Sequence, residues 1–372
     1  MIFKVGPLET GLLRALDYVA FPFLGLYAGV MVDRWRRKPV LVWTNILQVV
    51  ALGSIPAAFL LGWLSLLQIF LVASVMSATS VFFAVAYQAY LPVLIRREDL
   101  VEGNSKLEAS SSASGVAGPT IAGVLYQFFG PLSVAVDALG TFVAAIMICS
   151  IGKRESPTPR VVGRDFWEEL RAGIRVVVES PTLRSLTASN SIFNFGTNMF
   201  WAVFYLFIYE RLMFSPGLAG IVLGVGNIGF LVGVLASKWV LKRLGFGVAL
   251  TLALLINGLG LLSVQASILG PSAIMLAGLW FLTNIGLPIY NINQVSYRQT
   301  IVPDAVQGRM NATMRSIGYG AIVVGALIGG VVGLQFGILA AMNAGALISL
   351  IPVVIIWFGP VGRLRSIPQT ES

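Results

Sequence analysis

The side chains that could do chemistry in this chain are chiefly carboxylates set within apolar stretches. The sequence contains no histidine and one cysteine, Cys149, so it lacks the usual near-neutral proton carrier and any cysteine metal site. Asp17 and Asp137 each interrupt an apolar stretch, and Glu108 is a third candidate. Because an unpaired carboxylate inside a membrane is costly and usually serves a function, we predict that one of these groups carries a proton. For Asp17, an ion pair with Arg14 one helical turn away is an equally good interpretation.

Amide and aromatic side chains indicate a ligand cavity. The first set recurs at helical spacing on one face and comprises Asn190, Asn194, Asn198, Trp201 and Tyr205. The second set lies in a later apolar stretch and comprises Asn284, Tyr290, Asn291 and Gln294. Amides in membrane helices also serve simply to bond a neighbouring helix, which is the alternative. Three amides on one face beside large rings suit a bulky, mostly apolar ligand with a few polar groups.

The elements that carry these residues are predicted to be membrane-spanning helices. Charged residues make up 11% of the 372 residues and hydrophobic residues 57%, whereas soluble domains contain about 25% charged residues. Apolar stretches of about 20 residues recur, and each can cross a hydrocarbon core about 30 Å thick. The predicted fold class is an all-α polytopic membrane protein. We predict eleven spans, at residues 11–32, 40–62, 66–91, 104–129, 132–151, 186–209, 217–237, 246–268, 272–295, 309–333 and 337–358.

The basic residues predict the orientation of these spans. Of the 25 Lys and Arg residues, 22 fall on one side, which the positive-inside rule assigns to the cytoplasm. We therefore expect a multi-pass protein of the plasma (inner) membrane with a cytoplasmic C-terminus and an extracytoplasmic N-terminus. The net charge of +9 then reflects topology and not nucleic-acid binding. No nucleophile is paired with a base, so the sequence predicts neither an enzyme nor a metal or cofactor site.

The chain repeats itself at a distance of just over 200 residues. A shift of 204 aligns Gly25, Gly29, Arg34, Trp35 and Lys38 with Gly229, Gly233, Lys238, Trp239 and Lys242. A shift of 207 aligns Tyr90, Asn104, Gly118, Gly123, Phe129 and Gly130 with Tyr297, Asn311, Gly325, Gly330, Phe336 and Gly337. Such parallel repeats predict two halves of like topology.

The predicted organisation is an N-terminal half at 1–151, a cytoplasmic amphipathic linker at 152–185, a C-terminal half at 186–358 and a cytoplasmic tail at 359–372. The counterpart of the 186–209 span would lie before Met1, so one helix is expected to be missing from the sequence as given.

Two motifs give this organisation a family resemblance. The stretch "GVMVDRWRRKPV" contains Gly29, the pair Asp33 and Arg34, and a basic cluster with Arg37 and Lys38. It resembles the signature loop of the major facilitator superfamily, although an arginine stands where that loop commonly has a glycine.

The stretch "GVAGPTIAG" contains Gly115, Gly118, Pro119 and Gly123. It resembles the Gly-Pro motif in the fifth helix of drug/proton antiporters. The surrounding segment 100–130 resembles the branch with macrolide-efflux proteins and enterobactin-type exporters.

This resemblance implies the major facilitator fold, with two pseudo-symmetric halves and twelve helices, of which eleven are seen here. It implies a monomer in the lipid bilayer that moves a small molecule by alternating access. We predict proton-coupled efflux of an amphipathic compound, such as a macrolide drug or a siderophore. One alternative is uptake of a small solute by the same fold. The other is a truncated membrane protein that does not transport.

The resemblance also implies a role for the charged turn. Asp33 ends its predicted helix, where the helix dipole disfavours a carboxylate. The family packs this helix against the eleventh, which begins here near Arg309 and Arg315. We predict that Asp33 docks there and latches the cytoplasmic side while the cavity faces outward.

The repeat predicts a mate for this latch, with the signs of the charges exchanged. Lys238 would approach Glu102 or Glu108 at the start of the fifth helix. The alternative is that these charges only set topology.

Overall fold

The computed structural model describes residues 5–95, 99–152, 166–302 and 304–364, and every regular element in those ranges is helical. The longer helices are α1 (Pro7–Leu16), α2 (Ala20–Arg34), α3 (Arg37–Leu60), α4 (Leu66–Leu94), α5 (Leu100–Phe129), α6 (Val134–Ser150), α7 (Phe166–Glu179), α8 (Pro181–Leu206), α9 (Pro216–Leu244), α10 (Phe246–Ser263), α11 (Ser272–Ile301), α12 (Asp304–Phe336) and α13 (Ile338–Phe358). Short turns are η2 (Gly130–Ser133), η3 (Phe207–Arg211), η4 (Val264–Leu269) and η5 (Pro360–Arg363).

Within the described ranges, nine helical stretches are long and apolar enough to cross a membrane. One of them, Ser110–Ser150, contains the latter part of α5, η2 and all of α6. The all-helical, membrane-spanning fold class is therefore confirmed. α5 and α12 both end at a glycine with positive φ, Gly130 at 54° and Gly337 at 92°. The internal repeat aligns these two positions, and glycine adopts this conformation without the cost that a side chain adds.

The first predicted span, at residues 11–32, is wrong as a single helix. α1 ends at Leu16 and α2 begins at Ala20, so the chain is broken around Asp17 and Tyr18. The backbone N–H of Ala20 donates instead to the buried hydroxyl of Ser77 in α4, at 3.2 Å. A break of this kind is tolerated inside a membrane protein because a neighbouring helix satisfies the freed backbone group.

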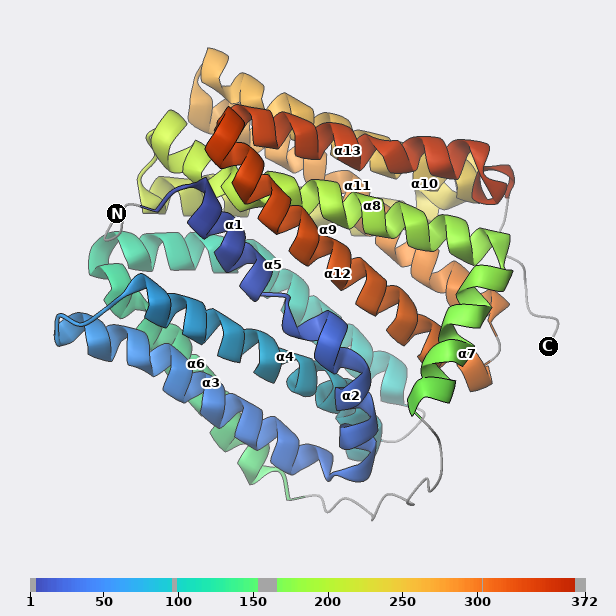
Figure 1. The fold of residues 1–372 in the computed structure, drawn as a ribbon, viewed down its shortest axis with the longest axis horizontal. Coiled ribbons are helices and arrows are strands. Elements are labelled where there is room, and N and C mark those ends of the chain that lie inside the picture. The colour runs from blue at the N-terminus through green and yellow to red at the C-terminus, as the bar shows by residue number, and fades with distance from the viewer. Residues whose placement is uncertain (1–4, 96–98, 153–165, 303, 365–372) are drawn as a thin grey trace.

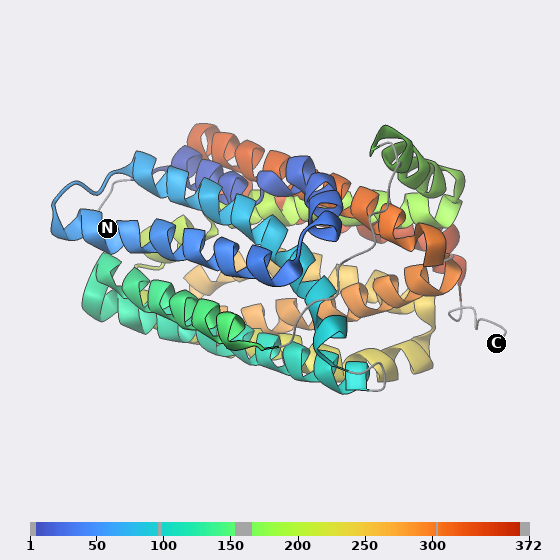
Figure 2. The same ribbon diagram turned by 90° about the horizontal axis from the view of Figure 1, so that it is seen from below.

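The helices form two halves that lie side by side, α1–α6 and α8–α13 (Figure 1). We call the end with the α5–α6 and α8–α9 turns the outer end, at the left of Figure 1, and the opposite end the inner end. α7 lies at the inner end and packs against α12, as Figures 1 and 2 both show. This contact is close, because a Cβ on Gly173 of α7 would lie 2.7 Å from the carbonyl oxygen of Arg309.

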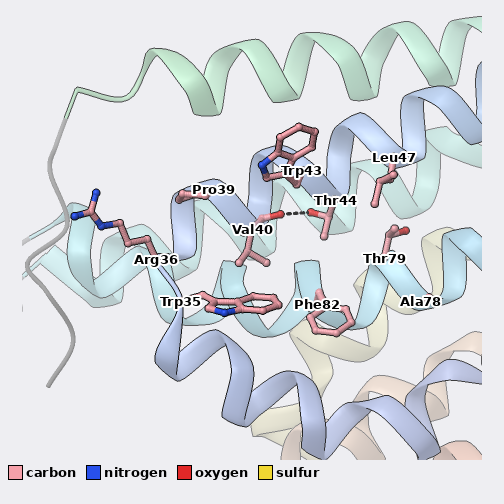
Figure 3. A pocket seen from close by; sticks show the side chains of 10 residues that line it. All are labelled: Trp35, Arg36, Pro39, Val40, Trp43, Thr44, Leu47, Ala78, Thr79 and Phe82. Atoms are coloured by element: carbon pink, nitrogen blue, oxygen red, sulfur yellow. Dashed lines mark hydrogen bonds between the residues drawn. The ribbon is translucent and has the colours of Figure 1, made fainter. Parts of the chain in front are cut away.

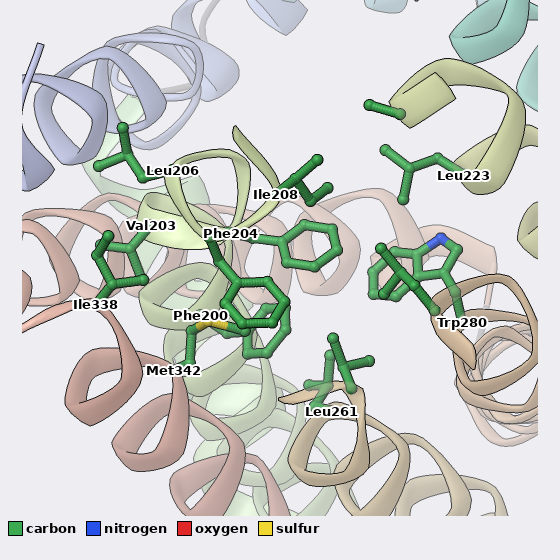
Figure 4. Packing of buried hydrophobic residues seen from close by; sticks show 14 of the residues in the cluster. Phe200, Val203, Phe204, Leu206, Ile208, Leu223, Leu261, Trp280, Ile338 and Met342 are labelled. Carbon is green, nitrogen blue, oxygen red and sulfur yellow. The ribbon is translucent and has the colours of Figure 1, made fainter. Parts of the chain in front are cut away.

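The second half is organised around α8, which packs between α12 and α13. Near its outer end, α8 contributes Phe200 and Phe204 to a buried cluster with Trp280 of α11 (Figure 4). The rings of Phe204 and Trp280 stack with centroids 4.9 Å apart. Trp201 meets the same indole edge-on at 5.2 Å. These offset and edge-to-face pairs fix the position of α8 more narrowly than aliphatic contacts would.

Small residues set how closely α8 approaches its neighbours. A Cβ on Gly196 would lie 2.6 Å from the carbonyl oxygen of Gly345 in α13, and one on Gly329 of α12 would lie 2.5 Å from that of Met199. Both distances are too short for a real side chain. Close backbone approach of this kind drives helix association in lipid, where burying apolar surface gains little.

The first half has no described counterpart of α8. By the repeat, α5 and α6 correspond to α12 and α13, and Gly118 corresponds to Gly325. A Cβ on Gly325 would collide with the carbonyl oxygen of Phe195 in α8, whereas nothing lies within 4 Å of a Cβ on Gly118. A groove of about 980 Å³ opens there between α5, α6, α8 and α9. This groove lies at the position in the first half that corresponds, by the repeat, to that of α8 in the second half.

Substituting Gly196 with alanine tests the close crossing of α8 and α13. Gly196→Ala is expected to lower the midpoint of thermal unfolding in detergent, because overpacking a close contact costs about 1–3 kcal/mol. Gly278→Ala is the matched control, since Gly278 is exposed and a Cβ there meets nothing within 4 Å. Alanine favours a helix over glycine by about 1 kcal/mol, so the control is expected to be neutral or stabilised. Equal midpoints for the two variants would contradict this account of the crossing.

Candidate functional site

The polar face of α8 meets the first half at Arg14 of α1. The Arg14 Nε donates a hydrogen bond to the Asn198 Oδ1 at 3.1 Å. Its guanidinium carbon lies 4.8 Å from the ring centroid of Tyr18 and 5.6 Å from that of Trp201. A cation held between two aromatic faces and an amide is well stabilised away from water. Arg14 therefore ties α1 to α8 across the two halves.

The break between α1 and α2 adds an aromatic cluster to this contact. The ring of Tyr18, within the break, stacks on Tyr319 of α12 with centroids 5.8 Å apart. The ring of Phe21 also stacks on Tyr319, with centroids 4.2 Å apart. Sequence reasoning missed Tyr18, Phe21 and Tyr319, because nothing in their spacing shows that a broken helix brings them together.

Asp17 does not form the predicted ion pair with Arg14. Among the described residues, no ion pair joins the two side chains, and Arg14 is engaged by Asn198 instead. Asp17 is exposed and caps the C-terminal end of α1. A carboxylate at the break of a membrane helix, beside the contact of the two halves, keeps the features that made it a candidate proton carrier.

Asn190 and Asn194 lie further toward the inner end of α8 and face α12. A Cβ on Gly318 would lie 3.0 Å from the Asn190 Nδ2 and 3.2 Å from the Asn194 Nδ2. Both asparagines are half-buried, and neither side-chain amide hydrogen bonds to any described residue. Since amides away from water normally find hydrogen-bond partners, these two half-buried groups stand out among the polar side chains of the described residues.

The α8 face ends in the groove between α5 and α6. Tyr205 is exposed and lines this groove together with Tyr209 and Asp137. Asp137 was predicted to lie about two turns into its span from the outer face, with no partner nearby in the sequence, and the structure places it closer to the start of its helix. The chain turns at Pro131, α6 begins at Val134, and Asp137 is an exposed residue of its first turn. The helix dipole stabilises a carboxylate there without any catalytic role.

The second predicted cavity set does not form one site. Tyr290 and Gln294 are only 1% and 5% exposed, and Tyr290 packs at 6.2 Å from Phe193 in the core of the second half. Asn291 is exposed on another face of α11. Asn284 donates to the Trp280 carbonyl oxygen of its own helix at 2.8 Å. The alternative reading of structural amides fits Asn284 best, because its donor is satisfied within the helix.

The Gly-Pro motif brings the two halves together at a second place. A Cβ on Gly123 of α5 would lie 2.5 Å from the carbonyl oxygen of Pro216 in α9. Beside it, the Thr120 hydroxyl donates to the Gly220 carbonyl oxygen at 3.2 Å. Toward the inner end, the Asn227 amide donates to the carbonyl oxygen of Gly115 at 3.0 Å. Pro119 lies within α5 between these contacts.

The repeat-related contact joins α1 to α12. A Cβ on Gly11 would lie 2.8 Å from the Cα of Gly330, the residue that the repeat aligns with Gly123. The contacts that join the two halves thus gather toward the outer end.

The predicted latch falls partly on side chains that are not described. Those of Gly29, Asp33, Arg34 and Glu108 lie outside the described residues. Arg37 and Arg309 are half-buried, and Arg315 and Lys238 are exposed. These positions leave the latch itself untested.

Two charges near the latch have other partners. The Lys38 Nζ donates to the carbonyl oxygens of Cys149 and Ile151 at 2.8 Å and 2.7 Å, so it caps the C-terminal end of α6. Glu102 pairs with Lys106 of its own helix at 2.7 Å, and not with Lys238 as one form of the prediction had it. The hydrogen bond from Lys106 holds the pKa of Glu102 below its usual value.

Comparison with known proteins agrees with this arrangement. The sequence pattern of the Major Facilitator Superfamily matches residues 2–319. The chain belongs to the major facilitator superfamily. It is a multi-pass membrane transporter, and the resemblance drawn from its motifs is confirmed.

Its relatives include several efflux proteins. It is similar to the multidrug efflux pump Tap of Mycolicibacterium fortuitum, with 25% identity over 366 residues, 92% of this chain and 84% of the relative. The enterobactin exporter EntS of Escherichia coli O1:K1 / APEC is 24% identical over 348 residues, 90% of this chain and 79% of the relative. Macrolide efflux protein A of Enterococcus faecalis is 25% identical over 243 residues, 64% of this chain and 72% of the relative.

Solved structures share the fold. The nucleoside transporter NupG superposes with a TM-score of 0.72 at 14% identity, over 95% of this chain and 90% of that chain. A bacterial homologue of the iron transporter ferroportin, in an inward-facing state, gives 0.68 at 17% identity, over 94% and 96%.

Proposed function

We propose that this transporter exports an amphipathic small molecule, coupled to protons, by alternating access between its two halves. The observation that carries the proposal is the pair of half-buried amides, Asn190 and Asn194, that make no hydrogen bond to a described residue and face α12. They lie on the same face of α8 as Trp201 and near the aromatic cluster at Tyr319. Rings would contact the apolar body of a ligand, and the amides would bond its few polar groups.

The efflux relatives support export and suggest the substrate class. Three of them are named for multidrug, enterobactin and macrolide export. A macrolide drug and a catecholate siderophore are both bulky, with polar groups on an otherwise apolar frame. We propose that the substrate is one of these two chemical types. We also propose that the transporter works as a monomer in the plasma (inner) membrane, with its C-terminus in the cytoplasm.

The distribution of contacts between the halves supports a state open toward the inner end. The glycine crossings at Gly11 and Gly123 and the Arg14 contact lie in the outer part of the bundle. Substrate would then enter from the cytoplasmic side, reach Asn190 and Asn194, and leave after the outer contacts part. Two-sided gating of this kind needs smooth crossings, which glycine contacts provide.

Asp17 is the proposed coupling carboxylate. It lies at the α1–α2 break, next to Tyr18, whose ring contacts α12. Protonation would remove a charge at the point where the halves meet, so it would change the relative free energies of the two states. Asp137 is a poorer candidate because the helix dipole accounts for it.

A transport assay tests the substrate proposal. The assay uses cells that lack other efflux pumps. Cells that express this protein are expected to accumulate less labelled erythromycin or enterobactin than the same cells without it. Asn194→Leu should lower the initial efflux rate about fivefold, the equivalent of about 1 kcal/mol for one lost hydrogen bond. Asn291→Leu, at an exposed amide of α11, should leave the rate unchanged. Export of neither compound would refute the proposed substrate class.

The coupling proposal predicts a difference between two aspartates. In vesicles with an imposed pH gradient, Asp17→Asn is expected to abolish gradient-driven transport while exchange of substrate without a gradient persists. Asp137→Asn, at the exposed N-terminal turn of α6, should retain most gradient-driven transport. If Asp17→Asn responds normally to the gradient, another group carries the proton.

We also propose the latch between Asp33 and the start of α12. It would stabilise the state that is closed at the inner end, which differs from the state described above. Asp33→Asn should slow transport several-fold, and it should raise the reactivity of a cysteine placed at Gly318 toward a membrane-impermeant reagent from the inner side. Asp99→Asn, which removes another carboxylate at the inner end of α5, is the control. Normal transport by Asp33→Asn would remove the latch.

A further inference from the structure

A second concavity lies on the surface of the first half, apart from the α8 face. It is a groove of about 790 Å³ between α3 and α4 at the inner end of the bundle (Figure 3). Its lining residues are Trp35, Arg36, Pro39, Val40, Trp43, Thr44, Leu47, Ala78, Thr79 and Phe82. Only one of these side chains carries a charge. The groove is therefore apolar along its length and cationic at one end.

The apolar part has the depth of one membrane leaflet. It runs along the first turns of α3, and Leu47 lies eleven positions after Arg36. At 1.5 Å per residue this is about 16 Å, close to half of a hydrocarbon core about 30 Å thick. Trp43 is 64% exposed and Leu47 50% exposed on a helix long and apolar enough to cross a membrane, so both lie open on the surface of the bundle. A single acyl chain lying along α3 would cover them.

The floor and entrance of the groove are aromatic. The indole of Trp35 stacks on Phe82 of α4 with centroids 6.5 Å apart, and Figure 3 shows both rings lining the same side. Trp35 and Trp43 together bracket the segment that begins α3. Tryptophan favours the level of the lipid headgroups, which places this end of the groove at the membrane interface.

The charged end is not used by the fold. Arg36 is exposed, and within the described part of the chain its guanidinium has no hydrogen bond or ion pair. Lys38, by contrast, caps α6. α3 begins at Arg37 with no side-chain cap and no acidic residue in its first turn, so its free N–H groups add to the positive potential beside Arg36. A phosphate is the group that this charge fits.

We infer that this groove binds one anionic phospholipid of the inner leaflet, with an acyl chain along α3 and α4 and its phosphate at Arg36. The inference is independent of what the transporter moves, since it rests only on α3, α4 and the turn before them. A lipid held there would brace the charged turn between α2 and α3 against the membrane interface.

Quenching of tryptophan fluorescence tests the site directly. The full-length protein is reconstituted in phosphatidylcholine nanodiscs that contain a minor fraction of either phosphatidylglycerol or phosphatidylcholine with brominated chains. The quenching assigned to the groove is the part of the total quenching that is lost when Trp43 is replaced in Trp43→Phe. We expect brominated phosphatidylglycerol to be preferred about fivefold over brominated phosphatidylcholine, as one basic residue near an anionic headgroup provides.

The variants separate the charged end from the apolar end. Arg36→Gln is expected to abolish the preference for phosphatidylglycerol while some quenching by both lipids remains. Arg243→Gln, an exposed arginine at the inner end of α9, should keep the full preference. Ala78→Leu, which fills the groove, should weaken quenching by both lipids. Equal quenching by the two lipids in the unsubstituted protein, or a preference that survives Arg36→Gln, would overturn the inference.

Discussion

Close contact of helix backbones at small residues is the constraint on which this structure depends. In a bilayer the lipid tails are as apolar as leucine, so helices gain little by burying apolar faces against each other. Gly196 and Gly345 let α8 and α13 touch, and Gly329 does the same for α12. The same device joins the two halves at Gly11 with Gly330 and at Gly123 with Gly220. Packing within a half and contact between halves are thus built from one kind of interaction.

These crossings decide which polar groups meet. Because α1 lies against both α8 and α12, the Arg14 side chain reaches Asn198, and the break after Leu16 turns Tyr18 onto Tyr319. The halves touch through glycine, one cation, stacked rings and a few hydrogen bonds between α5 and α9, such as those donated by Thr120 and Asn227. The amides of Asn190 and Asn194 lie just inward of this junction, where a ligand would sense the state of both halves.

The charged turn between α2 and α3 serves several purposes within a few residues. Lys38 caps the C-terminal end of α6, and Arg36 lies at one end of the apolar groove between α3 and α4. Each role follows from where the backbone directs the side chain. A single sum of positive charge at the inner face, which is all that the positive-inside rule uses, does not distinguish between them.

The sequence by itself determined the membrane fold, the superfamily, the internal repeat and the polar face of α8, because hydropathy, charge and helical spacing are local properties. Only the tertiary structure decided that the first span is broken at Asp17, since the freed backbone group is satisfied by Ser77, 57 residues further along the chain. It likewise placed Tyr290 and Gln294 in a packed core and Asp137 at an exposed helix start. Burial and partners depend on contacts between distant segments, and these are not written in the spacing of any one helix.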